Sequence, residues 1–312
     1  MEQIRTLDKL VEYAKEIGPK KVAVACAEDH VVLEAVERAR SEGIVDAILV
    51  GNADKIAEEA AKAGIDLANY EVADCKNGPA KTALMTVEMV SSGKADIMMK
   101  GMLESSDFLR AVLDKEIGLR SGKRVLSHSY IHEIKGWDRL IFVTDGVFNT
   151  YPELADKIGI AKNVTELCHA FGIEMPKIAC LAAVEVVNPK MQSTLDAAAL
   201  AQMNRRGQIK GCLLDGPFAL DNAVSEESAK HKGITGEVAG KADVLLVDDI
   251  DCGNALFKSI VYFSENKTAG IILGTKKPVI LTSRADSAET KFLSIATAVV
   301  ECYRKSAVLK TH

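Results

Sequence analysis

Aromatic side chains are scarce in this chain of 312 residues, because Phe, Trp and Tyr together make up only 5% of it. Hydrophobic residues of all kinds nevertheless reach 48%. A core with so few rings has to be built from Ala, Val, Ile and Leu. This composition is typical of helices packed against buried parallel strands, and it disfavours an aromatic-rich β-sandwich.

Long apolar runs and long basic runs are also missing. No stretch approaches the ~20 apolar residues that span a membrane. The N-terminal segment spaces Ile4, Leu7, Leu10 and Val11 like an amphipathic helix and lacks the apolar region of a signal peptide. Lys and Arg are scattered through a chain of net charge −5, which disfavours a nucleic-acid surface. We therefore expect a cytoplasmic protein with neither a membrane nor a nucleic acid as its partner.

Residue patterns that hold metals or disulfides are absent as well. The seven cysteines are an odd number without a C-x-x-C pair, and most lie in apolar runs, where a thiol acts as a small hydrophobe. There is no HExxH motif, and His128 and His132 follow a strand-like run without an obvious third ligand. The sequence predicts reduced thiols, which agree with a cytoplasmic location, and no bound metal.

Common nucleotide and nucleophile fingerprints are missing too. Neither G-x-G-x-x-G after the first strand nor G-x-x-x-x-G-K-[ST] occurs, and G-x-S-x-G is absent. A standard dinucleotide-binding fold and a P-loop kinase are therefore disfavoured.

What the chain does contain is a regular alternation of short β-branched runs and longer helical patterns. Runs that are apolar on both faces and separated by helices predict an α/β fold with mostly parallel sheets. About ten strands are too many for one compact sheet of this length, so we expect two α/β domains. No Pro/Gly/Ser linker separates them, which predicts domains that meet along a tight cleft. The expected strands lie at 22–26, 47–51, 95–101, 124–131, 140–146, 177–186, 211–217, 242–249, 269–274 and 278–283.

Polar residues or glycines end several of these runs. In open parallel sheets, ligands bind in the crevice at the carboxyl ends of the strands. We therefore expect the chemistry at one or more of these ends: 100–101, 144–146, 215–217, 248–249 and 282–284.

The segment KGMLESSDFLRAVLDK is a candidate phosphate cradle. A strand ends at Lys100–Gly101, and Ser105 or Ser106 can cap a helix that carries Arg110 one turn in. Free backbone N–H groups, hydroxyls and a guanidinium suit a phosphate. The alternative is an ordinary helix start, since the acidic residues of this segment would repel an anion. The spacing leaves both interpretations open.

The segment KADVLLVDDIDCGNALFK ends a buried strand in a cluster of acids. Asp248, Asp249 and Asp251 could bind Mg²⁺. They could equally form a turn and cap a helix at Asn254 while contacting substrate, and we favour this second interpretation.

The segment GTKKPVILTSRADSAETK places Ser283 and Arg284 at the end of a strand. The guanidinium fits a phosphate or a developing oxyanion with two N–H donors. Asp286, Ser287 and Glu289 then begin the C-terminal helix. On spacing alone, a helix start with capping acids remains the alternative.

Through these three segments, and through essentially its whole length, the chain resembles the phosphate acetyl/butyryl-transferase family. The ILTSRADS stretch is closer to the butyryl branch than to the acetyl branch. The resemblance implies a two-domain, three-layer α/β/α fold related to the isocitrate/isopropylmalate dehydrogenases. It implies one domain of residues 1–124 plus 289–312, a second of residues 125–288, and an active site in the cleft between them. A homodimer or higher homo-oligomer would be the functional form.

The reaction implied by the resemblance is acyl-CoA plus phosphate giving acyl phosphate plus CoA, by direct attack in a ternary complex. The coenzyme A thioester is a substrate, no cofactor stays bound, and butyryl is the favoured acyl group. Phosphate acetyltransferase is the alternative, followed by a metal-dependent 2-hydroxyacid dehydrogenase of related fold that would use the acid cluster.

Site residues follow from matching the family's motifs. Its Ser-Arg pair falls on Ser283 and Arg284, and Asp286 or Glu289 could supply the base, because the acetyl branch's aspartate aligns with Thr290. The resemblance assigns phosphate and CoA binding to Ser105, Ser106, Arg110, Asn254, Lys258 and Lys277.

Overall fold

The computed structural model of the protein describes residues 2–309, and contacts within the chain divide them into two compact units. The terminal unit comprises Leu7–Arg124 together with the chain from Ala269 onward, and the central unit comprises Val125–Thr268 together with the segment up to Thr6. The expected division into residues 1–124 plus 289–312 and residues 125–288 stays a prediction. In the contact-based division the terminal unit resumes at 268/269, because the strand that precedes Ser283 pairs with a strand of this unit.

The terminal unit alternates helices and strands from its start. In chain order its elements are α1 (Leu7–Ile17), β1 (Lys20–Ala25), α2 (His30–Ser41), β2 (Val45–Gly51), α3 (Ala53–Ala63), a 3₁₀ turn (Leu67–Asn69), β3 (Glu71–Asp74), α4 (Pro79–Ser91), β4 (Ile97–Lys100), α5 (Ser105–Val112), most of β10 (Asn266–Leu273), β11 (Val279–Ile280) and α11 (Ala288–Leu309).

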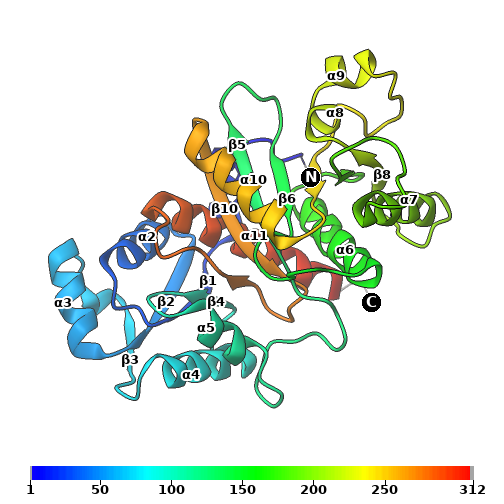
Figure 1. The fold of residues 1–312 in the computed structure, drawn as a ribbon. Helices are drawn as coiled ribbons and strands as arrows, with labels where there is room; N and C mark the ends of the chain where they lie inside the picture. Colours follow the sequence, from blue (N-terminus) through cyan, green and yellow to red (C-terminus); the bar gives the residue numbers. More distant parts are fainter. Residues whose placement is uncertain (1, 310–312) are drawn as a thin grey trace. The chain divides into compact units, whose positions relative to one another are not determined.

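The strands of this unit lie in the order β3-β2-β1-β4-β11-β10. All neighbours are parallel except β10 and β11. The chain runs outward from β1 to β3 and then returns to β4 on the other side of β1, so the order reverses between β1 and β4. Right-handed crossovers put α2 and α3 on one face and α4 on the other, as Figure 1 shows. The crevice at such a reversal is where open α/β sheets bind ligands.

Local sequence explains where these elements begin and end. The Asp29 side chain accepts a hydrogen bond from Val32 N and caps the start of α2. The Asn52 side chain accepts from Asp54 N and Lys55 N and caps the start of α3. Gly64 ends α3 in the left-handed conformation, at φ 68°, that favours glycine. The strands expected at 22–26, 47–51 and 95–101 match β1, β2 and β4, whereas the strand expected at 278–283 is reduced to β11, and β3, with its partly exposed EVAD sequence at the sheet edge, was not expected.

Glycine at position 101 lets β4 approach β1 at the sheet's carboxyl edge. A Cβ there would lie 2.7 Å from the Ala25 carbonyl oxygen. Gly101 N instead donates to that oxygen at 2.8 Å, and Met102 N donates to Cys26 O at 2.7 Å. These bonds fix the chain that leaves Lys100.

The central unit is a second α/β layer structure. In chain order its elements are β5 (Ser127–Ile134), β6 (Ile141–Thr144), α6 (Leu154–Ala170), β7 (Lys177–Leu181), α7 (Gln192–Arg205), β8 (Leu213–Phe218), α8 (Leu220–Val224), α9 (Glu226–His231), β9 (Val244–Leu246) and α10 (Ile250–Phe263). Its strand order is β5-β6-β9-β7-β8, with β5 and β6 antiparallel and the others parallel. The predicted α/β class with mostly parallel strands is confirmed. Within residues 2–309, no helix is both long and apolar enough to cross a membrane.

Candidate active site

A small recess lies at the carboxyl edge of the terminal unit, next to the order reversal of its sheet. It measures about 10 Å³, roughly the space that one water molecule needs. The recess brings together the ends of β4 and β11 with the first turn of α2 and one side chain of α11. It is lined by Asp29, Val32, Lys100, Gly101, Met102, Thr282, Ser283, Arg284 and Lys291.

The pairing of β11 with β4 explains why distant segments meet here. Ile280 is paired with Met99 in a parallel register. The residues that follow each strand therefore leave the sheet side by side, which brings Ser283 and Arg284 to the level of Lys100 and Gly101. This is the crevice that the polar strand ends predict.

Ser283 opens a tight turn that its own neighbours hold. Ser283 N donates to Asp286 Oδ2 at 2.6 Å, and Ala285 N donates to Ser283 Oγ at 3.3 Å. Lys291, which is 2% exposed, donates from Nζ to Ser283 O at 2.9 Å and to Asp286 O at 3.0 Å. The serine hydroxyl is thus presented on a rigid support, as a donor to a reacting centre requires.

Arg284 points to the surface, where its guanidinium lies 2.9 Å from Glu104 Oε1. The two side chains are 53% and 62% exposed. An exposed ion pair of this kind contributes about 0–1 kcal/mol. An anionic substrate could therefore displace Glu104 and take the guanidinium at low cost.

Lys100 is the buried cation of the recess, with 3% of the residue exposed. Its Nζ donates to Gly101 O at 3.4 Å. Burial, together with the positive charges of Arg284 and Lys291, lowers the pKa of Lys100 to about 8. Burial also lowers the pKa of Lys291.

Sequence reasoning did not assign a role to Lys100 or Lys291. A signal existed for Lys100, because it ends the apolar run of residues 95–101. No comparable signal marks Lys291, which lies within a helix. Only the fold of α11 onto the recess reveals it.

The expected phosphate cradle at α5 lies beside this recess but differs in its cap. Ser105 and Ser106 are the exposed first residues of the helix, and Glu104 takes the N-cap position without a side-chain cap bond among the described residues. The predicted cap by Ser105 or Ser106 is therefore wrong, because the helix starts one residue earlier. Arg110 is 73% exposed and pairs with Asp107 at 2.7 Å.

The two candidate bases both have structural partners. The carboxylate of Asp286 accepts from Ser283 N, as described above. Glu289 on α11 forms an ion pair with Arg38 of α2. The Ser287 hydroxyl donates a hydrogen bond to the hydroxyl oxygen of Thr290 at 3.2 Å. A base role for Asp286 or Glu289 stays a prediction.

Lys277 does not reach the carboxyl edge. It precedes β11, so it lies at the amino ends of the parallel strands, where its Nζ is 4.0 Å from Asp96 Oδ1. Asp96 itself precedes β4. The structure thus places Lys277 and Ser283 at opposite edges of the same sheet.

Asn254 and Lys258 belong to the central unit, on α10. The cap of this helix is Asp249, whose side chain accepts from Cys252 N at 2.8 Å, so the expected capping by the acid cluster is confirmed, although the helix begins at Ile250 rather than at Asn254. Asn254 Nδ2 instead donates to Gly146 O at 3.4 Å, and Lys258 is exposed one turn later. Gly146 and Gly253 permit this close approach, because a Cβ on Gly146 would lie 2.7 Å from the Gly253 carbonyl carbon.

The acid cluster after β9 is built around a lysine that the sequence did not reveal. Lys157 of α6 is 4% exposed and pairs with both Asp248 and Asp196, the latter at 2.7 Å. These residues line a cavity of about 460 Å³ in the central unit. Among the described residues, no group of three or more His, Cys, Asp or Glu side chains could hold a metal ion.

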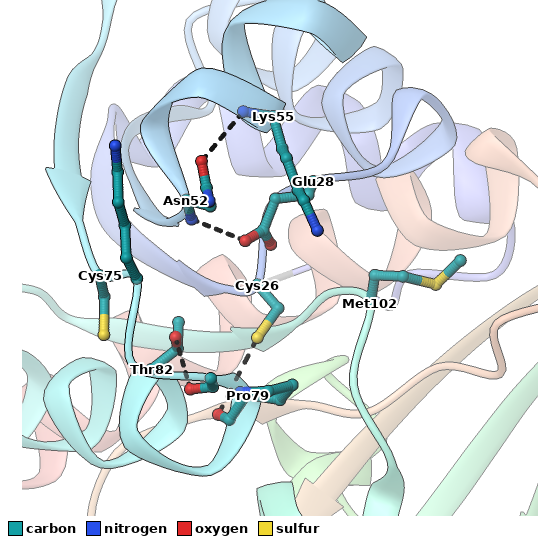
Figure 2. A pocket seen from close by; sticks show the side chains of 10 residues that line it. Cys26, Glu28, Asn52, Lys55, Cys75, Pro79, Thr82 and Met102 are labelled. Atoms are coloured by element: carbon teal, nitrogen blue, oxygen red, sulfur yellow. Dashed lines mark hydrogen bonds between the residues drawn. The ribbon is translucent and has the colours of Figure 1, made fainter.

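A larger cavity adjoins the recess in the terminal unit. It measures about 300 Å³ and shares Met102 with the recess, and Figure 2 shows the side chains that line it. Glu28 accepts from Asn52 N at 2.6 Å, and Cys26 faces Pro79 at the start of α4. Burial raises the pKa of the Cys26 thiol to about 12, so this cysteine is not a thiolate nucleophile at neutral pH.

Comparison with known proteins identifies close relatives along nearly the whole chain. The family model described as phosphate acetyl/butaryl transferase matches residues 5–85 and 79–299. A phosphate butyryltransferase of Clostridium beijerinckii is 53% identical, covering 96% of this chain and 99% of its own. A phosphate acetyltransferase of Thermotoga maritima is 45% identical over 94% and 99% of the two chains. A crystal structure of a branched-chain phosphotransacylase from Enterococcus faecalis V583 aligns with a TM-score of 0.80 and 32% identity, covering 91% and 99%.

Proposed function

The chain belongs to the phosphate acetyl/butyryl transferase family, and on this basis we propose that it moves a short acyl group between coenzyme A and inorganic phosphate. The reaction is acyl-CoA plus phosphate giving acyl phosphate plus CoA, and it runs in both directions. Butyryl is the favoured acyl group, because butyryltransferases are more similar to the chain than the acetyltransferase is.

We propose Arg284 and Ser283 as the groups that act on the reacting centre. When a thiolate or a phosphate oxygen attacks the acyl carbonyl, negative charge develops on the carbonyl oxygen. The Arg284 guanidinium stabilises that charge or the phosphate itself, and the Ser283 hydroxyl donates a hydrogen bond to the same centre. Removal of one such donor typically costs about 10²–10³ in turnover.

Both substrates would react directly, without an acyl-enzyme. Holding acyl-CoA and phosphate in one crevice replaces a bimolecular encounter by an oriented one, which supplies much of the acceleration. The recess measures about 10 Å³ and has space for one water molecule, so neither the acyl carbonyl nor the phosphate would enter it. The chemistry would take place at the mouth of the recess, where Ser283 and Arg284 lie.

Binding roles rest on position and charge. Ser105, Ser106 and Arg110 offer hydroxyls, free helix N–H groups and a guanidinium on α5, which begins next to the Glu104 partner of Arg284. Lys258 and Asn254 are the proposed CoA contacts of the central unit. The support for Lys277 is weaker, since it lies at the other edge of its sheet.

We further propose that the protein works in the cytoplasm as a homo-oligomer, with acyl-CoA, inorganic phosphate and acyl phosphate as its small-molecule partners and no resident cofactor. We propose that no metal binds in the acid-lined cavity of the central unit, because the ammonium group of Lys157 already forms ion pairs with Asp248 and Asp196.

The observation that carries the proposal is the Ser283–Arg284 turn at the carboxyl edge of a chain that matches the family over residues 5–299. The test mixes the purified protein with butyryl-CoA and phosphate and follows thiol release with a colorimetric reagent. A series from acetyl- to hexanoyl-CoA then measures the preferred chain length. Release that depends on phosphate and persists in excess chelator is expected. Absence of release with every acyl-CoA would contradict the proposed function.

A further inference from the structure

The proposed reaction needs a group that takes the proton of the CoA thiol, and the carboxylates near Ser283 are already engaged. Asp286 accepts the Ser283 backbone N–H, and Glu289 is paired with Arg38. A thiol has a pKa of ~8.5 and is a poor nucleophile until it loses its proton. A base with a similar pKa would be well matched to this task.

Lys100 is the one buried amine of the recess whose nitrogen is left available. Among the described residues, its Nζ makes a single long hydrogen bond, to Gly101 O at 3.4 Å. Lys291, the other buried lysine, donates to two carbonyl oxygens at 2.9 and 3.0 Å and is committed to holding the Ser283 turn. Lys100 therefore differs from Lys291 in what its nitrogen can do.

The position of Lys100 puts this amine beside the proposed catalytic pair. Lys100 is the last residue of β4, and Ser283 and Arg284 follow β11, the strand paired with β4. All three line the same recess of about 10 Å³, so one water there could bridge Nζ to a group at the mouth. A general base acts within hydrogen-bond reach or through one water.

We propose that Lys100 is the general base and acid of the reaction, and that it exchanges a proton with the sulfur of coenzyme A. This proposal rests on the proposed function.

The proton and electron movements balance in each direction. When the thioester forms, the neutral amine takes the S–H proton, sulfur attacks the acyl carbonyl, and a C–S bond forms. The C–O bond to phosphate then breaks, phosphate leaves with the electron pair, and the ammonium returns its proton to solvent. In the reverse direction a phosphate oxygen attacks, the C–S bond breaks, and the ammonium protonates the departing thiolate.

The charges around Lys100 support this role. Burial, Arg284 and Lys291 lower its pKa to about 8, against the opposing effect of Glu104 and Asp286. Asp29, the N-cap residue of α2, also lines the recess. The positive charge of Lys100 acts to lower the pKa of Cys26, which follows β1, against the larger opposing effect of burial. About a tenth of the amine is therefore neutral at pH 7, whereas an ordinary lysine would be almost entirely charged.

The test compares Lys100→Met, Lys100→Arg and wild type in the reaction of butyryl phosphate with CoA, from pH 6.5 to 9.5. Arg keeps the positive charge but cannot act as a base. Lys62→Met, on the exposed face of α3, is the matched control. Circular dichroism and thermal unfolding check that each variant folds.

We expect both Lys100 variants to lose at least about 10²-fold in kcat/KM at pH 7, the lower end of the range typical of general-base catalysis. The loss should shrink to about threefold at pH 9.5, because CoA is then a thiolate without help. A Lys100→Arg variant within threefold of wild type at pH 7 would show that only the charge matters and would overturn the proposal. A deficit that is the same at every pH would overturn it equally.

Two further readouts separate the possible failures. If both variants unfold, the wild-type profile of kcat/KM for butyryl-CoA decides, because this substrate carries no thiol: activity that does not fall above about pH 8 contradicts an acid of this pKa. If the wild type transfers no acyl group at all, the proposed function is at fault. If it does and the Lys100 profiles match its own, only the role of Lys100 is wrong.

Discussion

Lys291 of α11 donates a hydrogen bond from its buried ammonium group to the backbone carbonyl oxygen of Ser283, at 2.9 Å. The lysine and the serine are eight residues apart in the chain, and a second bond to Asp286 O closes the clamp. The turn that presents Ser283 and Arg284 is thus held by the helix that follows it. The position of Ser283 and Arg284 therefore depends on the position of α11.

Lys291→Met should weaken both the fold and the turn. The side chain has a similar length, but the carbonyl oxygens of Ser283 and Asp286 lose the Lys291 donor, and Ser283 O keeps only Asp286 N among the described residues, at 3.2 Å. The loss costs about 1–3 kcal/mol in the free energy of unfolding. We expect kcat to fall at least tenfold, since the serine hydroxyl loses its position. Urea unfolding and butyryl-transfer kinetics measure the two effects. Wild-type kcat in a destabilised variant would show that the clamp serves stability alone.

Arg284→Ala should lower turnover by about 10²-fold while the protein stays folded. The side chain is half exposed and, within the described part of the chain, is ion-paired with exposed Glu104 alone, so its loss costs little stability. Arg284→Lys should recover part of the activity, because it restores the charge without the two parallel donors. Arg206→Ala, at the exposed end of α7, is the control. Near-normal turnover in Arg284→Ala would contradict the assignment of this site.

Asp286→Asn and Glu289→Gln should change stability more than they change the pH dependence. Asp286→Asn keeps an acceptor for Ser283 N, and Glu289→Gln loses its ion pair with Arg38. We expect the ionisation seen in kcat/KM near pH 8 to stay in place in both variants. Its disappearance in either one would identify that carboxylate as the base.

Stability should fall below about pH 6.5, and His132 is one cause. Burial lowers the pKa of His132 from 6.5 to about 3, so the unfolded chain binds a proton in this window that the folded chain does not. The free energy of unfolding therefore decreases as the pH falls, by up to about 1.4 kcal/mol per pH unit for this group.

The check is urea unfolding at pH 4.5, 5.5 and 7 for wild type and His132→Gln. The glutamine variant should lose less stability between pH 7 and 4.5, although the exchange weakens the contact of His132 Nδ1 with Thr268 Oγ1, 2.9 Å long. His231→Gln, at an exposed position, serves as the control. An unchanged pH dependence in His132→Gln would remove this histidine from the explanation.

Local pattern was sufficient for most of the fold. Apolar runs such as 47–51 and cap residues such as Asn52 and Gly64 act over a few residues, so strand and helix positions in the terminal unit follow from the chain itself. The sequence did not predict the edge strand β3, because its EVAD segment is partly exposed and lacks an apolar run. Which unit β11 joins cannot be predicted from the local sequence either, since it depends on the strand with which β11 pairs.

The candidate site divides in the same way. The sequence alone determined that Ser283 and Arg284 follow a buried strand, since a polar pair after an apolar run marks a strand end. It also marked Lys100 as the end of another strand. Tertiary structure decided that these two ends adjoin, because β4 and β11 are separated by most of the chain and only their pairing brings them together. It also turned Glu289 toward Arg38, left Lys277 at the opposite edge, and buried Lys100 and Lys291 beside the pair. Burial and neighbouring charge determine the chemistry of an amine, and both arise only when the chain is folded.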